Sequence, residues 1–195
     1  MKRIIDIFAS AFMLILLFPF GLVIALLIAC DSRGGVFYRQ SRVGRNNRDF
    51  TLYKFRTMRT DADRLGLLTV GARDPRVTRV GYYLRKYKID ELPQLLNILS
   101  GDMSFVGPRP EVRKYVDLYN NEQKKVLSVR PGLTDYASIA YINENEILEK
   151  ANDKEQTYIN EIMPEKIKLN MKFIQNPSLY QYFKIIFLTI KSIFI

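Results

Sequence analysis

The sequence predicts an α-rich α/β protein that is attached to a membrane surface. Three observations lead to this fold class: an apolar N-terminal run, two short strand patterns after it, and amphipathic helical patterns in most of the remaining chain. The 195 residues suffice for one sizeable core, so we divide the chain into a membrane segment, residues 1–31, and one domain, residues 32–195. A net charge of +10 favours an anionic partner: a membrane face, a phosphorylated substrate or a nucleic acid.

The apolar run covers residues 4–30 and contains a single charged side chain, that of Asp6. A straight helix of this length would cross a hydrocarbon core of about 30 Å. The run is longer than the apolar stretch of about 7–15 residues in a signal peptide, and no Ala-x-Ala cleavage pattern follows it. We therefore interpret it as a retained membrane segment.

Two topologies are open for this segment, a re-entrant hairpin and a spanning helix. Pro19 predicts a kink in its middle, because proline removes an amide donor and clashes with the preceding turn. Basic residues flank both of its ends, which favours both ends on the cytoplasmic side. In the hairpin, Asp6 would lie at the membrane interface, where Lys2 or Arg3 could pair with it.

Residues 36–40 and 50–55 have the composition of two short strands on either side of a basic loop. Asn46 and Asn47 in the loop indicate a turn. Alternation along the second strand places Lys54 and Arg56 on one face of the strand. We expect these two cations to project together.

Five helical patterns follow the strands. Residues 77–87 are expected to form a basic helix. In the helix after it, we expect Asp90 to be the N-cap, Glu91 to lie in the first turn and Gly101 to be the C-cap. A short strand should follow. Residues 111–127 and 143–172 have further helical patterns, with a turn at 130–132. Residues 180–195 mix apolar side chains with two lysines, which predicts an amphipathic helix in the membrane interface from about residue 178; a core helix is the alternative.

The residue types available limit the chemistry. Cys30 is the sole cysteine and histidine is absent, which excludes an internal disulfide and a His/Cys zinc site. Acid–base chemistry would have to use carboxylates, lysine or tyrosine. The most informative group is the adjacent carboxylates Asp90 and Glu91, which suit binding of Mg²⁺ or nucleophilic attack on phosphorus. Helix capping is the competing interpretation of this pair.

Several cations from different predicted elements would accompany the carboxylates. Arginine suits bidentate contact with phosphoryl oxygens, and a rigid Gly-Pro-Arg-Pro corner presents Arg109. The candidates for phosphate binding are Lys54, Arg56, Arg85, Arg109 and Arg130. With the acid pair, they indicate a phosphoryl-transfer site at a membrane surface.

The chain closely resembles the small monotopic bacterial sugar transferases, which are phosphoglycosyl transferases acting on polyprenyl phosphate. The matching segments are KRIIDIF, the Pro-interrupted apolar run, VFYRQSRVG, YKFRTM, LRKYKIDELPQLLNILSGDMSFVGPRPE and VRPGLT, which together cover nearly all of residues 1–135. The resemblance implies one re-entrant hairpin, without the four-helix extension of larger relatives, and a cytosolic α/β domain with interfacial helices. It places the protein at the cytoplasmic face of the bacterial inner membrane.

The resemblance also implies a reaction. A sugar 1-phosphate would pass from a UDP-sugar to undecaprenyl phosphate with release of UMP, as the first membrane step of surface glycan or glycoconjugate assembly. Asp90 would be the nucleophile that forms a sugar-phosphoryl aspartate, with Glu91 as its acidic partner and Mg²⁺ as cofactor. The matching family cations fall on Lys54, Arg85 and Arg109.

After Thr134 the match loosens. Residues 135–143 differ from the Gly-Trp-Ala-Gln-Val pattern of many relatives, and Asn170 lies where relatives often carry an aspartate. A catalytically impaired relative and a basic peripheral membrane adaptor are therefore the alternatives. We expect no nucleic-acid partner, because the apolar N-terminus argues against one. The sequence leaves the sugar and the presence of a homodimer open.

Overall fold

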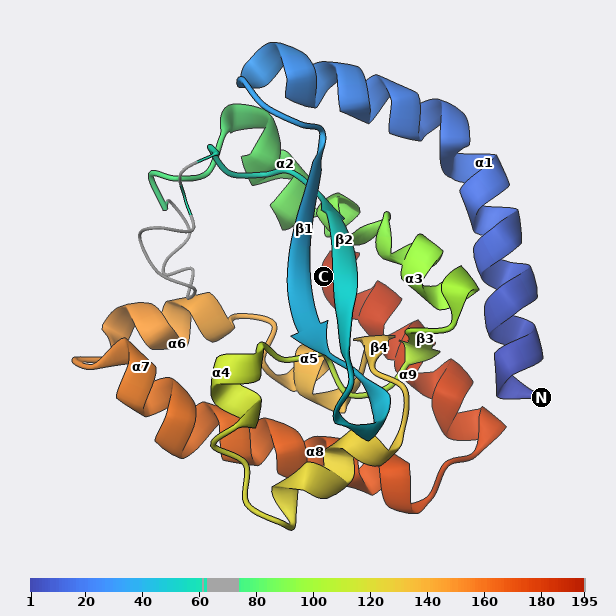
Figure 1. The fold of residues 1–195 in the computed structure, drawn as a ribbon, viewed down its shortest axis with the longest axis vertical. Helices are drawn as coiled ribbons and strands as arrows, with labels where there is room; N and C mark the ends of the chain where they lie inside the picture. The colour runs from blue at the N-terminus through green and yellow to red at the C-terminus, as the bar shows by residue number, and fades with distance from the viewer. Residues whose placement is uncertain (61, 63–73, 195) are drawn as a thin grey trace.

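The computed structural model describes residues 1–60, 62 and 74–194 and shows a helix-rich α/β protein with two small sheets (Figure 1). The strands are β1 (Phe37–Val43), β2 (Asp49–Phe55), β3 (Ser104–Val106) and β4 (Gly132–Thr134). The α-helices are α1 (Lys2–Asp31), α2 (Arg79–Lys86), α3 (Gln94–Ser100), α4 (Arg113–Val116), α5 (Tyr136–Ala140), α6 (Glu144–Lys150), α7 (Lys154–Thr157), α8 (Met163–Gln175) and α9 (Leu179–Phe194). The predicted α-rich α/β class is confirmed.

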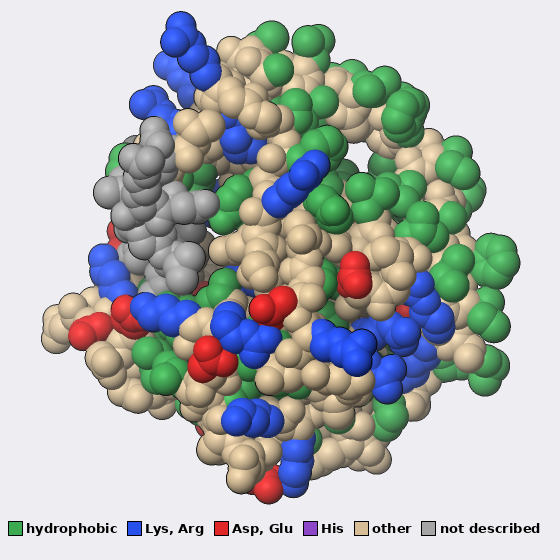
Figure 2. Space-filling model, in the orientation of Figure 1, with side chains coloured by type: hydrophobic (Ala, Val, Ile, Leu, Met, Phe, Trp, Pro, Cys, Tyr) green, Lys and Arg blue, Asp and Glu red, His purple; other side chains and the backbone are tan. Residues whose placement is uncertain are grey.

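Helix α1 is one continuous helix that contains Pro19 and bends along the edge of the domain (Figure 1). Its length and composition are those of a helix that could cross a membrane, and its most apolar 18-residue window is only 6% buried. Figure 2 shows hydrophobic side chains along its outer face, whereas most of the charged side chains in the same view lie over the middle and lower parts of the domain. The bend agrees with the kink predicted at Pro19, while the placement of the helix relative to a membrane stays a prediction.

The N-terminal end of α1 is attached to the domain through a buried carboxylate. Asp6 is 2% exposed and accepts hydrogen bonds from the Tyr182 hydroxyl (2.7 Å), the Ser104 hydroxyl (3.1 Å) and the Phe105 amide (3.2 Å). The predicted pairing of Asp6 with Lys2 or Arg3 is therefore wrong, because neutral donors from β3 and α9 bind this carboxylate instead.

Arginines bind the C-terminal carbonyls of two helices. Arg3 donates to the Leu99 carbonyl at the end of α3 (3.0 Å). Arg56 donates to the carbonyls of Arg33 and Ser32, the latter at 2.8 Å, just beyond the end of α1. Next to Arg56, Ile28 of α1 packs in one buried cluster with residues of β2 and α2. Both ends of α1 are thus attached to the same domain.

Strands β1 and β2 form an antiparallel hairpin in which Tyr38 pairs with Lys54, which confirms the two predicted strands and extends the first. Helix α3 packs behind β2, where the Asn97 side chain donates to the Thr51 carbonyl (2.7 Å) and accepts from the Tyr53 amide (3.1 Å). The Asn97 side chain thus pairs backbone groups of β2 that a neighbouring strand would otherwise pair, and it fixes the position of α3 against the hairpin.

The segment between α2 and α3 differs from its prediction. Ile89–Glu91 is a 3₁₀ turn preceded by Lys88 in the left-handed region (φ 57°), and α3 begins only at Gln94 after Pro93. Asp90 is therefore not a helix N-cap, and its side chain can serve the cavity described below. The C-cap prediction is confirmed: Gly101 has φ 101°, a conformation that favours glycine.

The prediction of one long helix at 111–127 and another at 143–172 is wrong, because each segment is divided into several shorter helices. Helix α4 ends at Val116, and reciprocal side chain–amide hydrogen bonds of 2.9 Å between Asn120 and Gln123 precede a separate 3₁₀ helix, Gln123–Ser128. Asp153 accepts from the Gln156 amide and caps α7 (3.0 Å), so the second segment restarts there and continues through a π-helix, Tyr158–Ile162, into α8.

One face of the C-terminal helix α9 is that of a core helix, which was the alternative to the predicted interfacial helix. Tyr182 and Ile185 are fully buried in a core cluster with Val106 and Phe173, which makes one face of α9 part of the core. The opposite face exposes large apolar side chains, among them Phe187 (67% exposed). The placement of this exposed face in the membrane interface stays a prediction.

Candidate active site

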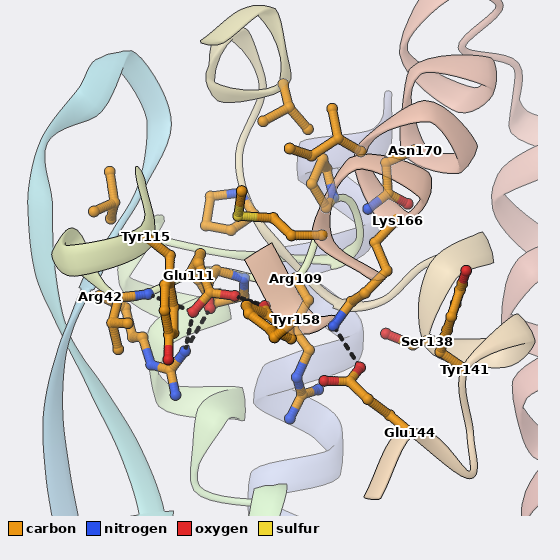
Figure 3. Close-up of a pocket in the computed structure, with 18 of the residues that line it drawn as sticks. Arg42, Arg109, Glu111, Tyr115, Ser138, Tyr141, Glu144, Tyr158, Lys166 and Asn170 are labelled. Carbon is orange, nitrogen blue, oxygen red and sulfur yellow. Dashed lines mark hydrogen bonds and ion pairs between the residues drawn. The ribbon is translucent and has the colours of Figure 1, made fainter. Parts of the chain in front are cut away.

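A cavity of about 370 Å³ lies between the β1–β2 hairpin, the α2–α3 segment, the corner after β3 and helices α5, α6 and α8. We call one group of its lining residues the cationic wall: Arg42, Lys54, Arg85, Lys88 and Arg109 with the acids Asp90, Glu91 and Glu111. We call a second group the neutral wall, because its two charged members pair with each other: Ser138, Tyr141, Glu144, Lys166 and Asn170. Figure 3 shows Arg42 and Glu111 on one side of the cavity, Lys166, Ser138 and Glu144 on the other, and Arg109 between them.

Asp90 and Glu91 are both buried in the cationic wall, with exposures of 5% and 8%. Glu91 forms a bidentate ion pair with Arg109, in which Nη1 lies 3.2 Å from Oε2 and Nη2 contacts Oε1, and it accepts from Lys54 Nζ at 3.0 Å. Lys54 Nζ lies farther from Asp90 Oδ2, at 3.9 Å, beyond hydrogen-bonding distance. The two neighbouring acids therefore have different surroundings.

These surroundings shift the two pKa values in opposite directions. Burial raises the pKa of Asp90, Lys54 opposes this effect, and the adjacent negative charge of Glu91 adds to it. Burial also acts to raise the pKa of Glu91, but Arg109 and Lys54 outweigh burial and hold that pKa well below its usual range. The cations thus favour the ionised form of Glu91, and Asp90 is the carboxylate that is not committed to a bidentate pair.

The position of Arg109 depends on a close approach of two chain segments. Strands β3 and β4 pair in parallel, and a Cβ atom added at Gly132 would lie 2.1 Å from the Gly107 amide nitrogen, so this contact requires glycine. The chain then turns at Pro108, and the Arg109 amide donates to Asp135 Oδ2 at 2.7 Å. The predicted rigid presentation of Arg109 is confirmed, and Glu91 raises the pKa of its guanidinium above an already high value.

The structure brings together Lys54, Arg85 and Arg109 with the acid pair, as the sequence suggested. Lys54 comes from β2 and Arg85 from the last turn of α2, and both also line a second cavity of about 270 Å³ that shares Asp90 with the first. Burial lowers the pKa of both Lys54 and Arg85. Asp90 therefore lies where two cavities with basic lining meet.

Two of the predicted cations have other roles among the described contacts. Arg56 is buried, donates to the carbonyls that end α1, and lines the second cavity rather than the first. Arg130 Nε donates to the Gly101 carbonyl at 2.8 Å, and in the described part of the chain it lines neither cavity. Arg56 thus shares the second cavity with Asp90, and a phosphate-binding role for Arg56 and Arg130 stays a prediction.

Sequence reasoning missed Arg42, Glu111 and Tyr158. Arg42 Nη1 donates to the Pro110 carbonyl (3.1 Å) and to Glu111 Oε1 (3.3 Å), and the Tyr158 hydroxyl donates to Glu111. Burial and Glu111 raise the pKa of Tyr158. The hairpin register could have identified Arg42: Tyr38 faces Lys54 across the strands, and Arg42 lies four residues further along the same face of β1.

The comparisons with known proteins identify the family of the chain. The bacterial sugar transferase family matches residues 1–195. The chain is 40% identical over 195 residues to a UDP-N-acetylgalactosamine-undecaprenyl-phosphate N-acetylgalactosaminephosphotransferase of Aeromonas hydrophila, covering 98% of this chain and 43% of that protein. It is 37% identical to a UDP-glucose:undecaprenyl-phosphate glucose-1-phosphate transferase of Caulobacter vibrioides, covering 98% of this chain and 69% of that protein.

A third relative, an undecaprenyl-phosphate glucose phosphotransferase of Komagataeibacter xylinus, is 38% identical over 97% of this chain and 35% of its own length. The chain therefore spans less than half of two of these three relatives. The family match covers the membrane helix, the acid pair and both walls of the cavity. The chain belongs to the bacterial sugar transferase family.

Proposed function

We propose that the protein transfers a sugar 1-phosphate from a UDP-sugar to undecaprenyl phosphate and releases UMP. The observation that carries this proposal is the division between the two buried acids: Glu91 is neutralised by Arg109 and Lys54, while Asp90 beside it keeps a carboxylate that lines the cavity. The names of the relatives support undecaprenyl phosphate as the acceptor and nucleotide sugars as donors.

The chemistry is a double displacement at one phosphorus atom. An Asp90 oxygen attacks the β-phosphorus of the donor, the bond from that phosphorus to the bridging oxygen breaks, and UMP leaves with the electron pair. A phosphate oxygen of the acceptor then attacks the same phosphorus and Asp90 leaves as a carboxylate. An ionised carboxylate needs no base to act as a nucleophile, which suits a chain without histidine.

The cationic wall would stabilise both steps. Arg109 is held by Glu91 and by Asp135, so its guanidinium is preorganised for phosphoryl oxygens before substrate binds. Lys54 and Arg85 line both of the cavities that Asp90 lines. These fixed charges oppose the negative charge that develops on the phosphoryl group and on the leaving UMP.

Mg²⁺ fits only part of the predicted ligand set. Magnesium is commonly bound by one or two carboxylates together with substrate phosphates and water. Both oxygens of Glu91 already accept from cations, so the prediction of Glu91 as a ligand conflicts with its contacts. Asp90 with the donor phosphates would hold the ion, which when bound would neutralise diphosphate charge.

We further propose that the protein lies at the cytoplasmic face of the inner membrane with α1 as a re-entrant element. Both ends of α1 are attached to one domain, at Asp6 and at Ile28, while the apolar middle is exposed. Cysteines introduced at positions 2 and 33 in a Cys30→Ser protein should both react with a reagent applied from the cytoplasmic side. Labelling from opposite sides would contradict this topology.

The proposed reaction is tested by UMP release from a panel of UDP-sugars with undecaprenyl phosphate and Mg²⁺. Without acceptor, wild-type protein should release a burst of UMP equal to the amount of enzyme, because the aspartyl intermediate accumulates. Asp90→Asn protein should release none. An absence of UMP with every donor would refute the transferase assignment, and a burst from the Asn variant would refute the nucleophile.

A further inference from the structure

A second polar group lies on the neutral wall, and the proposed phosphoryl transfer does not use it. The hydroxyl oxygen of Ser138 and the side-chain oxygen of Asn170 are buried, and neither has a hydrogen-bond partner among the described residues. Both side chains line the cavity. Buried polar atoms are nearly always paired with protein, water or ligand, so two unpaired ones in a substrate-sized cavity point to a ligand.

The contacts of Asn170 define what its oxygen can bind. Asn170 is 6% exposed, and its Nδ2 donates to Asp135 Oδ2 at 2.8 Å. An ionised carboxylate only accepts, so the amide nitrogen must face Asp135 and Oδ1 must face elsewhere. Asn170 Oδ1 therefore offers an acceptor, while Ser138 Oγ offers a donor as well as an acceptor.

One carboxylate holds this pair next to the phosphate-binding side. Asp135 accepts from Asn170, from the Ser138 amide and from the Arg109 amide, the last at 2.7 Å. The two residues that carry the unpaired atoms are thus linked to the backbone of Arg109 through a single side chain, the carboxylate of Asp135. In a UDP-sugar the sugar is bonded directly to the β-phosphate, whereas the α-phosphate and the ribose separate that phosphate from the uracil ring.

The charge of the neutral wall fits a neutral ligand group. Lys166 Nζ and Glu144 Oε2 form an ion pair at 2.7 Å, and the carboxylate of Asp135 is already occupied by three neutral N–H donors. Figure 3 shows Lys166, Glu144, Ser138 and Tyr141 together on this side of the cavity. The phosphates would instead be drawn to the cations Lys54, Arg85 and Arg109, of which Arg109 lies in the middle of the cavity (Figure 3).

We propose that Ser138 and Asn170 form the subsite that recognises the transferred sugar, by binding an exocyclic hydroxyl or acetamido group that both donates and accepts a hydrogen bond. This inference rests on the proposed function, because it names the sugar end of the same donor. A site with buried hydrogen-bonding groups discriminates against substrates that leave those groups unpaired. The pair would therefore set the preference of the enzyme among UDP-sugars.

The test measures binding in a protein that cannot react. In the Asp90→Asn background, affinities are measured by calorimetry for UMP and for UDP-glucose, UDP-galactose and their two N-acetylated counterparts. We expect the parent protein to prefer one sugar. Adding Ser138→Ala or Asn170→Ala should weaken binding of that sugar at least about tenfold and reduce the preference, with UMP affinity changed less than about twofold.

Asn160→Ala is the matched control, because Asn160 is an exposed amide outside the cavity and should leave all five affinities unchanged. Ser138→Ala is the milder variant should Asn170→Ala fail to fold, which its melting temperature reports. A parallel loss for UMP and all sugars would show that the pair binds the uridine, and unchanged affinities would show that it binds neither; both results overturn the proposal. Failure of the parent protein to bind any UDP-sugar would instead refute the proposed function.

Discussion

The two walls of the cavity use polar residues in different ways. On the cationic wall at least five of the eight charged side chains are paired in advance: Glu91 with Arg109 and Lys54, and Arg42 with Glu111. On the neutral wall, Ser138 and Asn170 keep atoms without a partner in the described structure. Preorganised charges stabilise a transition state without rearrangement, whereas unpaired neutral groups distinguish one ligand from another. The difference indicates that chemistry and specificity are separated within one cavity.

The largest expected effect is on the cationic wall. Asp90→Asn should reduce turnover at least about 1000-fold, because an amide cannot form the covalent intermediate, and Asp90→Glu should retain little activity because the longer side chain misplaces the nucleophile. UMP release measures both. Activity near that of the wild type in the Asn variant would remove the basis for assigning chemistry to this wall.

Arg109→Lys should lower kcat/KM about 100-fold, because lysine cannot make the bidentate contact with Glu91 or with a phosphoryl group. Arg113→Lys is the matched control: Arg113 also forms an ion pair, with Asp49, but it lies outside the cavity lining. Equal kinetics for the two lysine variants would show that Arg109 is structural.

The pH dependence should sharpen the assignment of the acids. Asp90 must be ionised to attack, and its pKa is raised by burial, so activity should fall as the pH decreases at a value above the ordinary 3.8 of aspartate. Glu91→Gln removes a like charge and should move this acidic limb to lower pH. Lys54→Met removes the opposing positive charge and should move it to higher pH. The kcat/KM that each variant retains, measured as a function of pH, reports both shifts. Shifts in the same direction would contradict the assignment of the acidic limb to Asp90.

The smallest effect is expected on the neutral wall at Lys166 and Glu144. Their ion pair is partly exposed, with 16% and 24% of the side chains accessible, and such a pair contributes about 0.2–1 kcal/mol. Glu144→Gln should therefore change kcat/KM less than about fivefold for every UDP-sugar. A loss as large as that of Arg109→Lys would mean that both walls take part in the chemistry.

Local sequence signals were sufficient for several elements. The apolar helix, the hairpin, the glycine cap at Gly101 and the corner at Arg109 follow from composition, alternation and the conformational limits of glycine and proline. Signals of this kind failed where side chains compete with the helix. The reciprocal bonds of Asn120 and Gln123 lie where the structure interrupts a helical pattern that hydrophobic periodicity alone would continue.

The sequence by itself determined which residues are available for chemistry: an acid pair, several arginines and lysines, and no histidine. The tertiary structure alone decided their roles. It paired Glu91 with Arg109, 18 residues away, and left Asp90 to line the cavity; it used Arg56 to hold the end of α1; and it brought Asn170 to Asp135 across 35 residues. The reason is physical: burial and the distance between charges set the ionisation and the partners of a side chain, and both quantities exist only after distant segments have packed together.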